Sequence, residues 1–516
     1  MALFVSLPRR PFLPFLTAVL ATVAWLSPAF AEDSESPAKA DPPEERSSST
    51  QHSVVIDGQT IDYTATAGWL ILDNAEGQPV AQFGYTAYTR QVDDLSQRPI
   101  LFAFNGGPGS SSIWLHMGVL GPQRVVATDV GYTPPPPALR VDNEYSVLDV
   151  TDLVMVDPVG TGFSKPVGVG KGEDFWGVDQ DIRSVGAFIK EFITRNRRWA
   201  SPKYILGESY GGIRSAGLTW YLQSNHGMSL NGLIMVSPFL NMGSGADGAG
   251  IDLPHVLYLS TLAATAWYHD ALDEKPASLE DFVAEVEAFA YDEYAPALLV
   301  GFTLDAERKQ AVAEKLAMYT GTSADYWSRA DLRVSHGQFL QELQRDKRII
   351  TGRIDSRFSG PSVNPLAENM DYDPFFPAVG PAFTAAFLDY LHNDLDFGHD
   401  EQYQVSAFSI DWDWSHTPPD TGGWLTPWAN LRGDLSHAIT ANPGLHVLVQ
   451  QGYYDLATPM HATKHDLEHL DITPQDRERI RLELYEAGHM MYLHQPSLEK
   501  YRRDLAGFIR DSDRVD

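Results

Sequence analysis

Hydrophobic residues recur along the chain in two patterns, one typical of strands and the other typical of helices. Between residues 53 and 89, β-branched and aromatic residues alternate with polar ones around an Asp57-Gly58 turn, which predicts antiparallel strands. Further on, short apolar runs are separated by longer helical patterns. The runs cover residues 100–104, 153–156, 204–206, 233–236, 446–449 and 480–485. This alternation predicts an α/β fold with a mixed, mostly parallel central sheet flanked by helices.

A long helical insertion interrupts this alternation between residues 250 and 432. Ser278 and Asp281 form a capping box in front of an apolar helix face, and several more helical periods follow. An insertion of this length, placed before the last two strands, predicts a mainly helical cap over residues 250–432. The core would then consist of two parts, residues 52–249 and 433–516.

The N-terminal stretch has the features of a secretory signal peptide. Arg9 and Arg10 precede an apolar run at residues 12–26, and an Ala-Phe-Ala cleavage site ends at Ala31. The apolar run is shorter than the roughly 20 residues that a membrane-spanning helix needs. We therefore expect residues 1–31 to be removed and the protein to be exported, periplasmic or secreted. Residues 32–51 are rich in Ser, Pro, Glu and Asp, which predicts a flexible linker.

Charge and cysteine content narrow the possible functions. The chain carries 68 acidic against 38 basic residues and a net charge of −30. Such a surface repels nucleic acid and anionic membranes, so neither is expected as a partner after signal cleavage. The chain has no cysteine, which excludes disulfides and a thiol nucleophile. Export without disulfides is typical of a bacterial protein whose core is large enough to be stable alone.

Ser209 is the candidate nucleophile. It is the central residue of a Gly-Glu-Ser-Tyr-Gly motif at residues 207–211, which follows an apolar run and precedes a helical pattern. That context is typical of a nucleophile elbow, in which glycines are needed because the strand and helix backbones come close together. Taken alone, the pentapeptide is also compatible with an ordinary Gly-rich turn.

A serine nucleophile needs a base, and the base needs a carboxylate that orients it. Asp455 follows the apolar run at 446–449 and a turn glycine, and His489 follows the run at 480–485 and Gly488. Hydrolases with this elbow have the chain order Ser, Asp, His, and parallel strands bring all three to one edge of the sheet. The sequence therefore predicts a catalytic triad of Ser209, Asp455 and His489.

An oxyanion hole requires two backbone N–H groups near the nucleophile. One comes from the residue after the serine, Tyr210, and the other from an early Gly-rich loop. An Asn-Gly-Gly-Pro-Gly loop directly follows the apolar run at 100–104, and its Gly107 is the predicted second donor.

Two features outside the triad have two possible interpretations each. His461, His465 and His469 have the spacing of a zinc site, but without an accompanying cysteine or glutamate arrangement one polar helix face is favoured. We predict no metal and no cofactor. Four tryptophans are compatible either with a substrate pocket or with loop packing, and packing is favoured for any one of them. They are Trp412, Trp414, Trp424 and Trp428.

Four sequence blocks together resemble the bacterial-type exported members of the serine carboxypeptidase family. They are residues 105–112 (NGGPGSSS), 157–164 (DPVGTGFS), 207–212 (GESYGG) and 488–490 (GHM). The resemblance implies an α/β-hydrolase fold and a serine-type carboxypeptidase that hydrolyses C-terminal peptide bonds through an acyl-enzyme. It also implies that Asn105, Gly106 and Glu208 bind the free C-terminus of a peptide substrate. An esterase, amidase or acyltransferase with the same triad is the alternative, and a noncatalytic binding protein is a third.

The chain departs from the family pattern at two positions. Familiar members have a cysteine where Ser110 stands, so packing and hydrogen bonds must hold this loop. They also have a second glutamate where Val119 stands, and two neighbouring carboxyls share a proton. Without that partner, the pKa of Glu208 should rise less. If residues 112–119 are helical, His116 shares a face with Val119 and could approach the substrate site, although a packed helix histidine is equally compatible.

Overall fold

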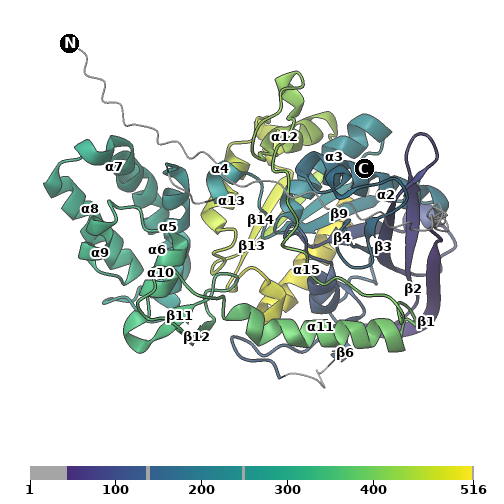
Figure 1. Cartoon of the computed structure of the whole chain (residues 1–516), viewed down its shortest axis with the longest axis horizontal. Coiled ribbons are helices and arrows are strands. Elements are labelled where there is room, and N and C mark those ends of the chain that lie inside the picture. Colours follow the sequence, from purple (N-terminus) through teal and green to yellow (C-terminus); the bar gives the residue numbers. More distant parts are fainter. Residues whose placement is uncertain (1–42, 135–139, 247–249, 514–516) are drawn as a thin grey trace, which may run out of the picture. The chain divides into compact units, whose positions relative to one another are not determined.

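A ten-stranded mixed sheet forms the framework of the protein (Figure 1). The structure is a computed structural model that describes residues 43–134, 140–246 and 250–513. The strand order is β1-β2-β3-β7-β4-β9-β10-β13-β14, and β8 pairs with β3 beside this path. The strands are β1 (Arg46–Ile56), β2 (Gln59–Asp73), β3 (Pro79–Thr89), β4 (Ile100–Phe104), β7 (Asp152–Val156), β8 (Lys165–Pro166), β9 (Lys203–Glu208), β10 (Gly232–Val236), β13 (His446–Gly452) and β14 (Ile480–Tyr485). The pairs from β7 to β14 are parallel, which confirms the predicted mostly parallel sheet.

Helices cover both faces of the sheet, which explains why its inner strands are continuous apolar runs rather than alternating ones. Every residue of β4 and of β10 is buried. In β9, Tyr204 and Leu206 belong to one hydrophobic cluster, whereas Ile205 belongs to a second. Each face of the sheet therefore has its own core, and β9 is fixed between them.

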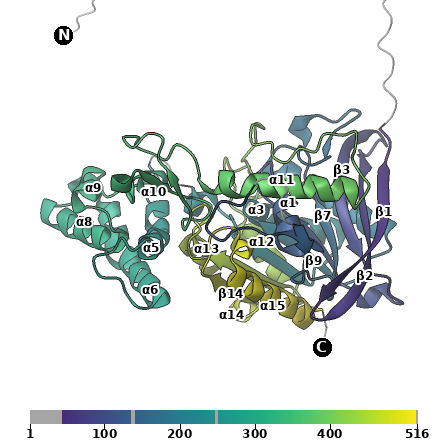
Figure 2. The same ribbon diagram turned by 90° about the horizontal axis from the view of Figure 1, so that it is seen from below.

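Two groups of helices supply these cores. The helices α2 (Val178–Arg195), α3 (Gly211–His226) and α12 (Arg432–Ala441) share the cluster of Ile205. The helices α1 (Ile113–Leu115), η2 (His116–Leu120), α11 (Phe375–Asn393) and α15 (Gln495–Ser512) share the cluster of Leu206 (Figure 2). The short elements between them are η1 (Leu95–Gln97), β5 (Gln123–Val125), β6 (Arg140–Asp142), η3 (Gly172–Asp174), α14 (Pro474–Arg477) and η8 (Met491–Leu493). Among the described residues, no helix has the length and apolar character needed to cross a membrane.

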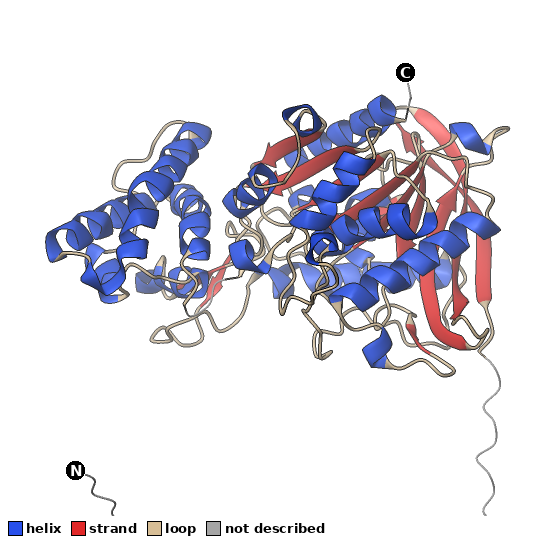
Figure 3. Ribbon diagram, turned by 90° about the horizontal axis from the view of Figure 1, so that it is seen from above, coloured by secondary structure: helices blue, strands red, loops and turns tan. Residues whose placement is uncertain are grey.

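The insertion contains a helical layer with a core of its own (Figure 3). Its elements are α5 (Leu253–Tyr268), α6 (Leu279–Phe289), η4 (Ala290–Tyr294), α7 (Ala295–Val300), η5 (Gly301–Thr303), α8 (Ala306–Thr320), α9 (Ala324–Arg329) and α10 (His336–Glu342). After η6 (Arg345–Lys347), a small hairpin of β11 (Ile349–Thr351) and β12 (Ser359–Pro361) returns toward the sheet. Helix α5 contacts α4 (Met242–Gly245) and α13 (Met460–Glu468), so this layer borders the ends of β10 and β13.

The second half of the insertion differs from the predicted helical cap. Helix α11 packs on the core of the sheet, where its buried Phe383 and Phe387 join the same cluster as Leu206. Between α11 and α12, the described residues form loops with only the short turn η7 (Pro419–Thr421). The reason is the apolar face of α11, which the core of the sheet buries.

The predicted linker at residues 32–51 is wrong for its last six residues, which form the start of β1. This polar stretch pairs antiparallel with β2, and the hydroxyls of Ser49 and Thr66 lie 2.9 Å apart across the pair. An edge strand needs no apolar side chains on its exposed face, so a polar composition does not distinguish such a strand from a linker. The predicted signal peptide and residues 32–42 lie outside the described residues.

Candidate active site

Ser209 lies in a sharp turn between the end of β9 and the start of α3. Its backbone φ is 64°, in the left-handed region that residues other than glycine rarely adopt. The turn is so tight that a Cβ at Gly207 would lie 2.2 Å from the carbonyl oxygen of Gly211. The Ser209 N–H donates to the carbonyl of Val236 at 3.0 Å, which ties the turn to β10. The nucleophile therefore has the local geometry of an elbow.

Asp455 and His489 follow β13 and β14 and form a buried pair, with 2.8 Å between Asp455 Oδ2 and His489 Nδ1. The carboxylate accepts further hydrogen bonds from the backbone N–H groups of Ala457 and Thr458, at 2.8 and 2.9 Å. Those two N–H groups bond Oδ1, whereas the Thr458 hydroxyl and the Gln451 amide donate to Oδ2, the oxygen that faces His489, at 2.7 and 3.1 Å. These donors fix the carboxylate toward Nδ1, which leaves His489 Nε2 as the nitrogen able to accept a proton.

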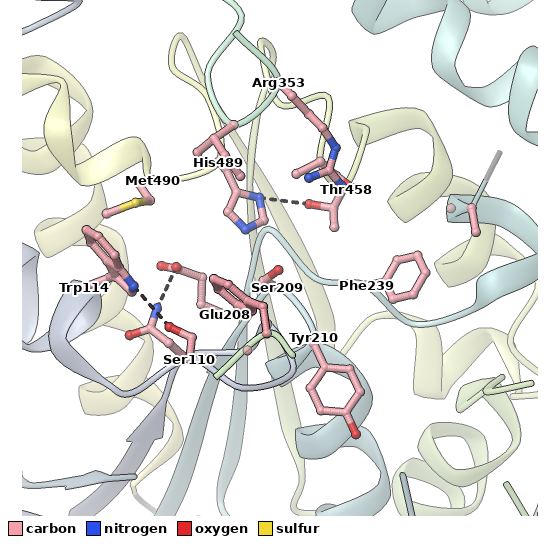
Figure 4. Close-up of a pocket in the computed structure, with 18 of the residues that line it drawn as sticks. Ser110, Trp114, Glu208, Ser209, Tyr210, Phe239, Arg353, Thr458, His489 and Met490 are labelled. Atoms are coloured by element: carbon pink, nitrogen blue, oxygen red, sulfur yellow. Dashed lines mark hydrogen bonds between the residues drawn. The ribbon is translucent and has the colours of Figure 1, made fainter. Parts of the chain in front are cut away.

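The surroundings of His489 favour a base that can carry a positive charge. Burial opposes protonation, but the Asp455 carboxylate and the nearby Glu208 outweigh it, so the pKa of His489 is raised. The imidazole lies above Ser209 in the cavity that both residues line (Figure 4). Ser209, Asp455 and His489 are thus brought together as the sequence predicts.

The Gly-rich loop packs directly against the elbow. A Cβ at Gly106 would lie 2.5 Å from the backbone nitrogen of Tyr210, so only glycine permits this contact. Gly107 has a φ of 108° and lines the cavity together with Tyr210 and Ser209. The Tyr210 side chain is buried and packs against Trp412, with 5.3 Å between the ring centroids. The two predicted oxyanion donors therefore border the same space as the nucleophile.

Glu208 presents a carboxyl group beside the nucleophile. Its Oε1 accepts a hydrogen bond from Asn105 Nδ2 at 2.7 Å, and its Oε2 accepts one from the Tyr492 hydroxyl at 2.8 Å. Burial raises the pKa of Glu208 to about 7, although these hydrogen bonds and the nearby His489 favour the ionised form. The group can therefore be protonated at neutral or mildly acidic pH, and a protonated carboxyl donates a hydrogen bond.

Tyr492 was not identified from the sequence. It lies in the short turn η8, three residues after His489, and its ring would touch any Cβ placed at Gly118, at 2.4 Å. Its ring thus packs against Gly118, next in sequence to Val119, and its hydroxyl donates to Glu208 Oε2 at 2.8 Å. No local pattern marks it, since a tyrosine in an apolar segment is most often a core residue.

The prediction that His116 approaches the substrate site is wrong. Residues 116–120 form a π-helical turn, closed by a 2.9 Å bond from the Gly121 N–H to the His116 carbonyl, so residues three apart no longer share a face. The imidazole is buried, with its Nε2 2.5 Å from the Tyr88 hydroxyl and its ring against Phe387. Burial lowers the pKa of His116 to about 3, so it is a neutral core residue.

Hydrogen bonds hold the loop that family members brace with cysteine. The Ser110 N–H donates to the Gly106 carbonyl at 3.1 Å, and Trp114 Nε1 donates to Ser110 Oγ at 3.1 Å. The loop also pairs with residues 405–407, where the Ala407 N–H donates to the Gly109 carbonyl at 2.7 Å. These bonds stabilise the loop without a disulfide.

The site opens into a cavity of about 550 Å³. Its wall is mostly apolar and includes Trp114, Phe239, Met242, Tyr258, Ile354, Phe376, Phe408, Trp414 and Met490. Of the four tryptophans considered, Trp414 lines the cavity and Trp412 packs on Tyr210, whereas Trp424 and Trp428 are exposed. The cavity also contains Arg353, which no sequence pattern singled out.

The three helical histidines have different surroundings. His461 is buried against Tyr291, and the rings of His465 and His469 lie 4.0 Å apart. Within the part of the chain that the structure describes, no group of three or more His, Cys, Asp or Glu residues is arranged to hold a metal ion.

Comparison with known proteins gives a family match for the first part of the chain. Residues 58–295 match the family model described as serine carboxypeptidase. Serine carboxypeptidase-like 36 from Arabidopsis thaliana is 28% identical over 175 residues, which cover 32% of this chain and 34% of that protein. The chain thus matches about a third of the length of this curated relative. The matched residues of this chain include Asn105 and Ser209 and end before Asp455 and His489.

A solved structure gives a match over most of the chain. Kex1Δp, a prohormone-processing carboxypeptidase from Saccharomyces cerevisiae, aligns with a TM-score of 0.52 and 16% sequence identity. The alignment covers 87% of this chain and 92% of the yeast one. At this level of identity the likeness shows the fold, and it confirms the predicted α/β-hydrolase fold.

Proposed function

We propose that the protein releases C-terminal residues from peptides through an acyl-enzyme, a function supported by the match of residues 58–295 to the serine carboxypeptidase family model. The observation that carries the proposal is the carboxyl group of Glu208 next to the nucleophile. Asn105 and Tyr492 each donate a hydrogen bond to one of its two oxygens. A cluster of this kind can hold a carboxylate, because an amide and a protonated carboxyl both donate hydrogen bonds. An esterase or endopeptidase has no need of it.

The reaction follows from the roles of the triad. Ser209 Oγ attacks the scissile carbonyl while His489 Nε2 accepts the hydroxyl proton, and Asp455 stabilises the imidazolium. The backbone N–H groups of Gly107 and Tyr210 stabilise the negative charge on the former carbonyl oxygen. When the C–N bond breaks, His489 returns the proton to the leaving amine. Water then attacks the ester with His489 again as base, which releases the acid product and restores Ser209.

Terminal-carboxylate binding makes this activity dependent on pH. Below a pH of about 7, Glu208 is protonated and donates a hydrogen bond to the substrate carboxylate. Above that pH it is ionised and repels the same group. The protonated form is accessible without the second family glutamate, because burial is the largest cause of the raised pKa of Glu208 and nearby Asp455 adds to it.

We also propose that the protein is an exported enzyme of bacterial type. Arg9, Arg10 and the apolar run at 12–26 support export, and the absence of cysteine fits a bacterial rather than a disulfide-braced secreted form. Mass spectrometry of the protein recovered after expression in a bacterium tests this. We expect a mature N-terminus at Glu32 in the exported fraction, and an uncleaved chain in the cytoplasm would contradict it.

Hydrolysis of matched small substrates tests the enzymatic proposal. N-blocked dipeptides are prepared as free acids, amides and methyl esters, and the kcat/KM of each is measured between pH 5 and 8. We expect the free acids to be preferred over the amides, and Ser209→Ala to abolish hydrolysis of the free acids and of the amides. Equal rates on acids and amides would favour an amidase, and activity on esters alone would favour an esterase or acyltransferase. Failure to cleave any of them would contradict the proposed chemistry.

A further inference from the structure

Arg353 is the only lysine or arginine among the described residues that line the active-site cavity. It lies just after β11 in the insertion and is half-buried. Its charge is close enough to His489 to oppose protonation of the imidazole. The chain as a whole has a net charge of −30, so this cation stands in a strongly acidic protein.

The backbone around Arg353 is tied to both loops of the catalytic pair. The Leu456 N–H donates to the Arg353 carbonyl at 3.0 Å, and the His489 N–H donates to the Ile354 carbonyl at 2.8 Å. The N–H groups of Arg353 and Ile354 both donate to Asp373 Oδ2, at 3.2 and 3.0 Å. The position of Arg353 is therefore fixed relative to the triad, as a group that recognises substrate requires.

The guanidinium of Arg353 has few partners. It donates a long hydrogen bond of 3.5 Å to the Ala457 carbonyl, and within the described part of the chain no carboxylate oxygen lies within 4 Å of it. Arg357, on the same segment, is different, because Asp355 lies 2.6 Å from its guanidinium. Since a guanidinium has five N–H donors, Arg353 can bind a planar anion in the cavity.

Arg353 and Glu208 lie on opposite sides of the catalytic pair. In Figure 4, Arg353, Thr458 and Phe239 are on one side of Ser209 and His489, and Glu208 and Trp114 are on the other. A substrate whose terminal carboxylate is held at Glu208 places its acyl part on the side of Arg353. Phe239 gives the same side apolar surface for the stem of a side chain (Figure 4).

We propose that Arg353 is a specificity-determining residue that binds an acidic side chain on the penultimate residue of the substrate. The inference rests on the proposed function, because it uses Glu208 to orient the peptide. An aspartate or glutamate at this position would form a charge-assisted, bidentate pair with the guanidinium. The enzyme would then remove C-terminal residues preferentially when an acidic residue precedes them.

Two isosteric substrates test the proposal. N-blocked dipeptides with Glu or Gln as the penultimate residue and the same C-terminal residue are compared in wild type, Arg353→Met and Arg353→Lys. Exposed Arg348 lies on the same segment, and Arg348→Gln is the matched control. We expect the Glu to Gln ratio of kcat/KM to fall about tenfold in Arg353→Met, the size of one charge-assisted hydrogen bond. It should be partly kept in Arg353→Lys and unchanged in Arg348→Gln.

A second measurement separates this inference from the proposed function. Diphenyl phosphonate analogues of N-blocked Glu and Gln label a reactive serine and carry no terminal carboxylate. Faster labelling of Ser209 by the Glu analogue, lost in Arg353→Met, would support the inference even if no dipeptide were hydrolysed. Equal labelling rates together with an unchanged Glu to Gln ratio would overturn it. A loss of preference for free acids over amides in Arg353→Met would also overturn it, because Arg353 would then bind the terminal carboxylate.

Discussion

The two sides of the active-site cavity are built in different ways. On one side, Glu208 is buried, and both of its carboxyl oxygens accept hydrogen bonds from residues of the core. On the other, Arg353 belongs to the insertion, is half-buried and donates one long hydrogen bond to Ala457. A carboxyl group with fixed partners suits the group that all substrates of a carboxypeptidase share. A guanidinium that donates a single long hydrogen bond within the described residues suits a group that varies between substrates. Under the proposed function, the core would therefore carry out the reaction and Arg353 of the insertion would contribute selectivity.

Loss of the nucleophile should abolish hydrolysis and leave both sides of the cavity able to bind substrate. We expect Ser209→Ala to lower kcat by at least about 10⁴-fold for all substrates, since activities of serine hydrolases without the serine fall by this order or more. Substrate binding should persist, because Glu208 and Arg353 remain. Isothermal titration with a free-acid and an amide peptide measures this, and equal affinities would show that the Glu208 side does not recognise the carboxylate.

Glu208→Gln should remove the alkaline limit of peptidase activity. In the wild type, kcat/KM for free-acid peptides should fall about tenfold per pH unit above a pH of about 7, because ionised Glu208 repels the substrate. Glutamine stays neutral and keeps a donor, so the profile of the variant should stay flat up to the next titration. The pH profile of the corresponding amide is the control. An unchanged fall in the variant would show that another group sets the limit.

Tyr492→Phe should shift the same limit without removing it. The tyrosine hydroxyl donates to Glu208 Oε2 and favours the ionised carboxyl, so its loss should raise the pKa of Glu208 further. We expect the alkaline limit for free-acid peptides to move to higher pH by up to about one unit, with a loss of about 1 kcal/mol in the free energy of unfolding. A shift to lower pH would contradict the described hydrogen bond.

His116→Phe should affect stability and leave catalysis unchanged. The imidazole is buried beside the Tyr88 hydroxyl, so the substitution leaves that hydroxyl without this partner and should cost about 1 kcal/mol or more. Urea denaturation measures the loss, and Tyr88→Phe combined with His116→Phe should cost less than the sum of the two single changes. A changed pH profile for kcat/KM would restore the hypothesis that His116 acts in the substrate site.

The catalytic residues could be predicted because each follows a strand and a tight turn within a few residues of the chain. Ser209, Asp455 and His489 are of this kind, and parallel strands bring such positions to one edge of a sheet. Gly107 is similar, since its loop directly follows β4. These relations between neighbours in sequence are visible without a structure.

The remaining features depend on contacts between distant segments. Tyr492 meets Glu208 across 284 residues of sequence, and the place of Arg353 depends on hydrogen bonds to the loops of Asp455 and His489. His116 was placed wrongly because a π-helical turn changes the face of a side chain, and its sequence resembles an ordinary helix. The start of β1 was missed because pairing with β2, rather than composition, makes it a strand.

The most direct test of the account is the digestion of a mixed peptide library followed by mass spectrometry. We expect products shortened from the C-terminus only, with faster release where Asp or Glu precedes the terminal residue. Peptides with amidated C-termini should persist, because they lack the carboxylate that Glu208 binds. Internal cleavage, or equal loss of the amidated peptides, would contradict the claim that a carboxylate-binding site beside Ser209 defines this enzyme.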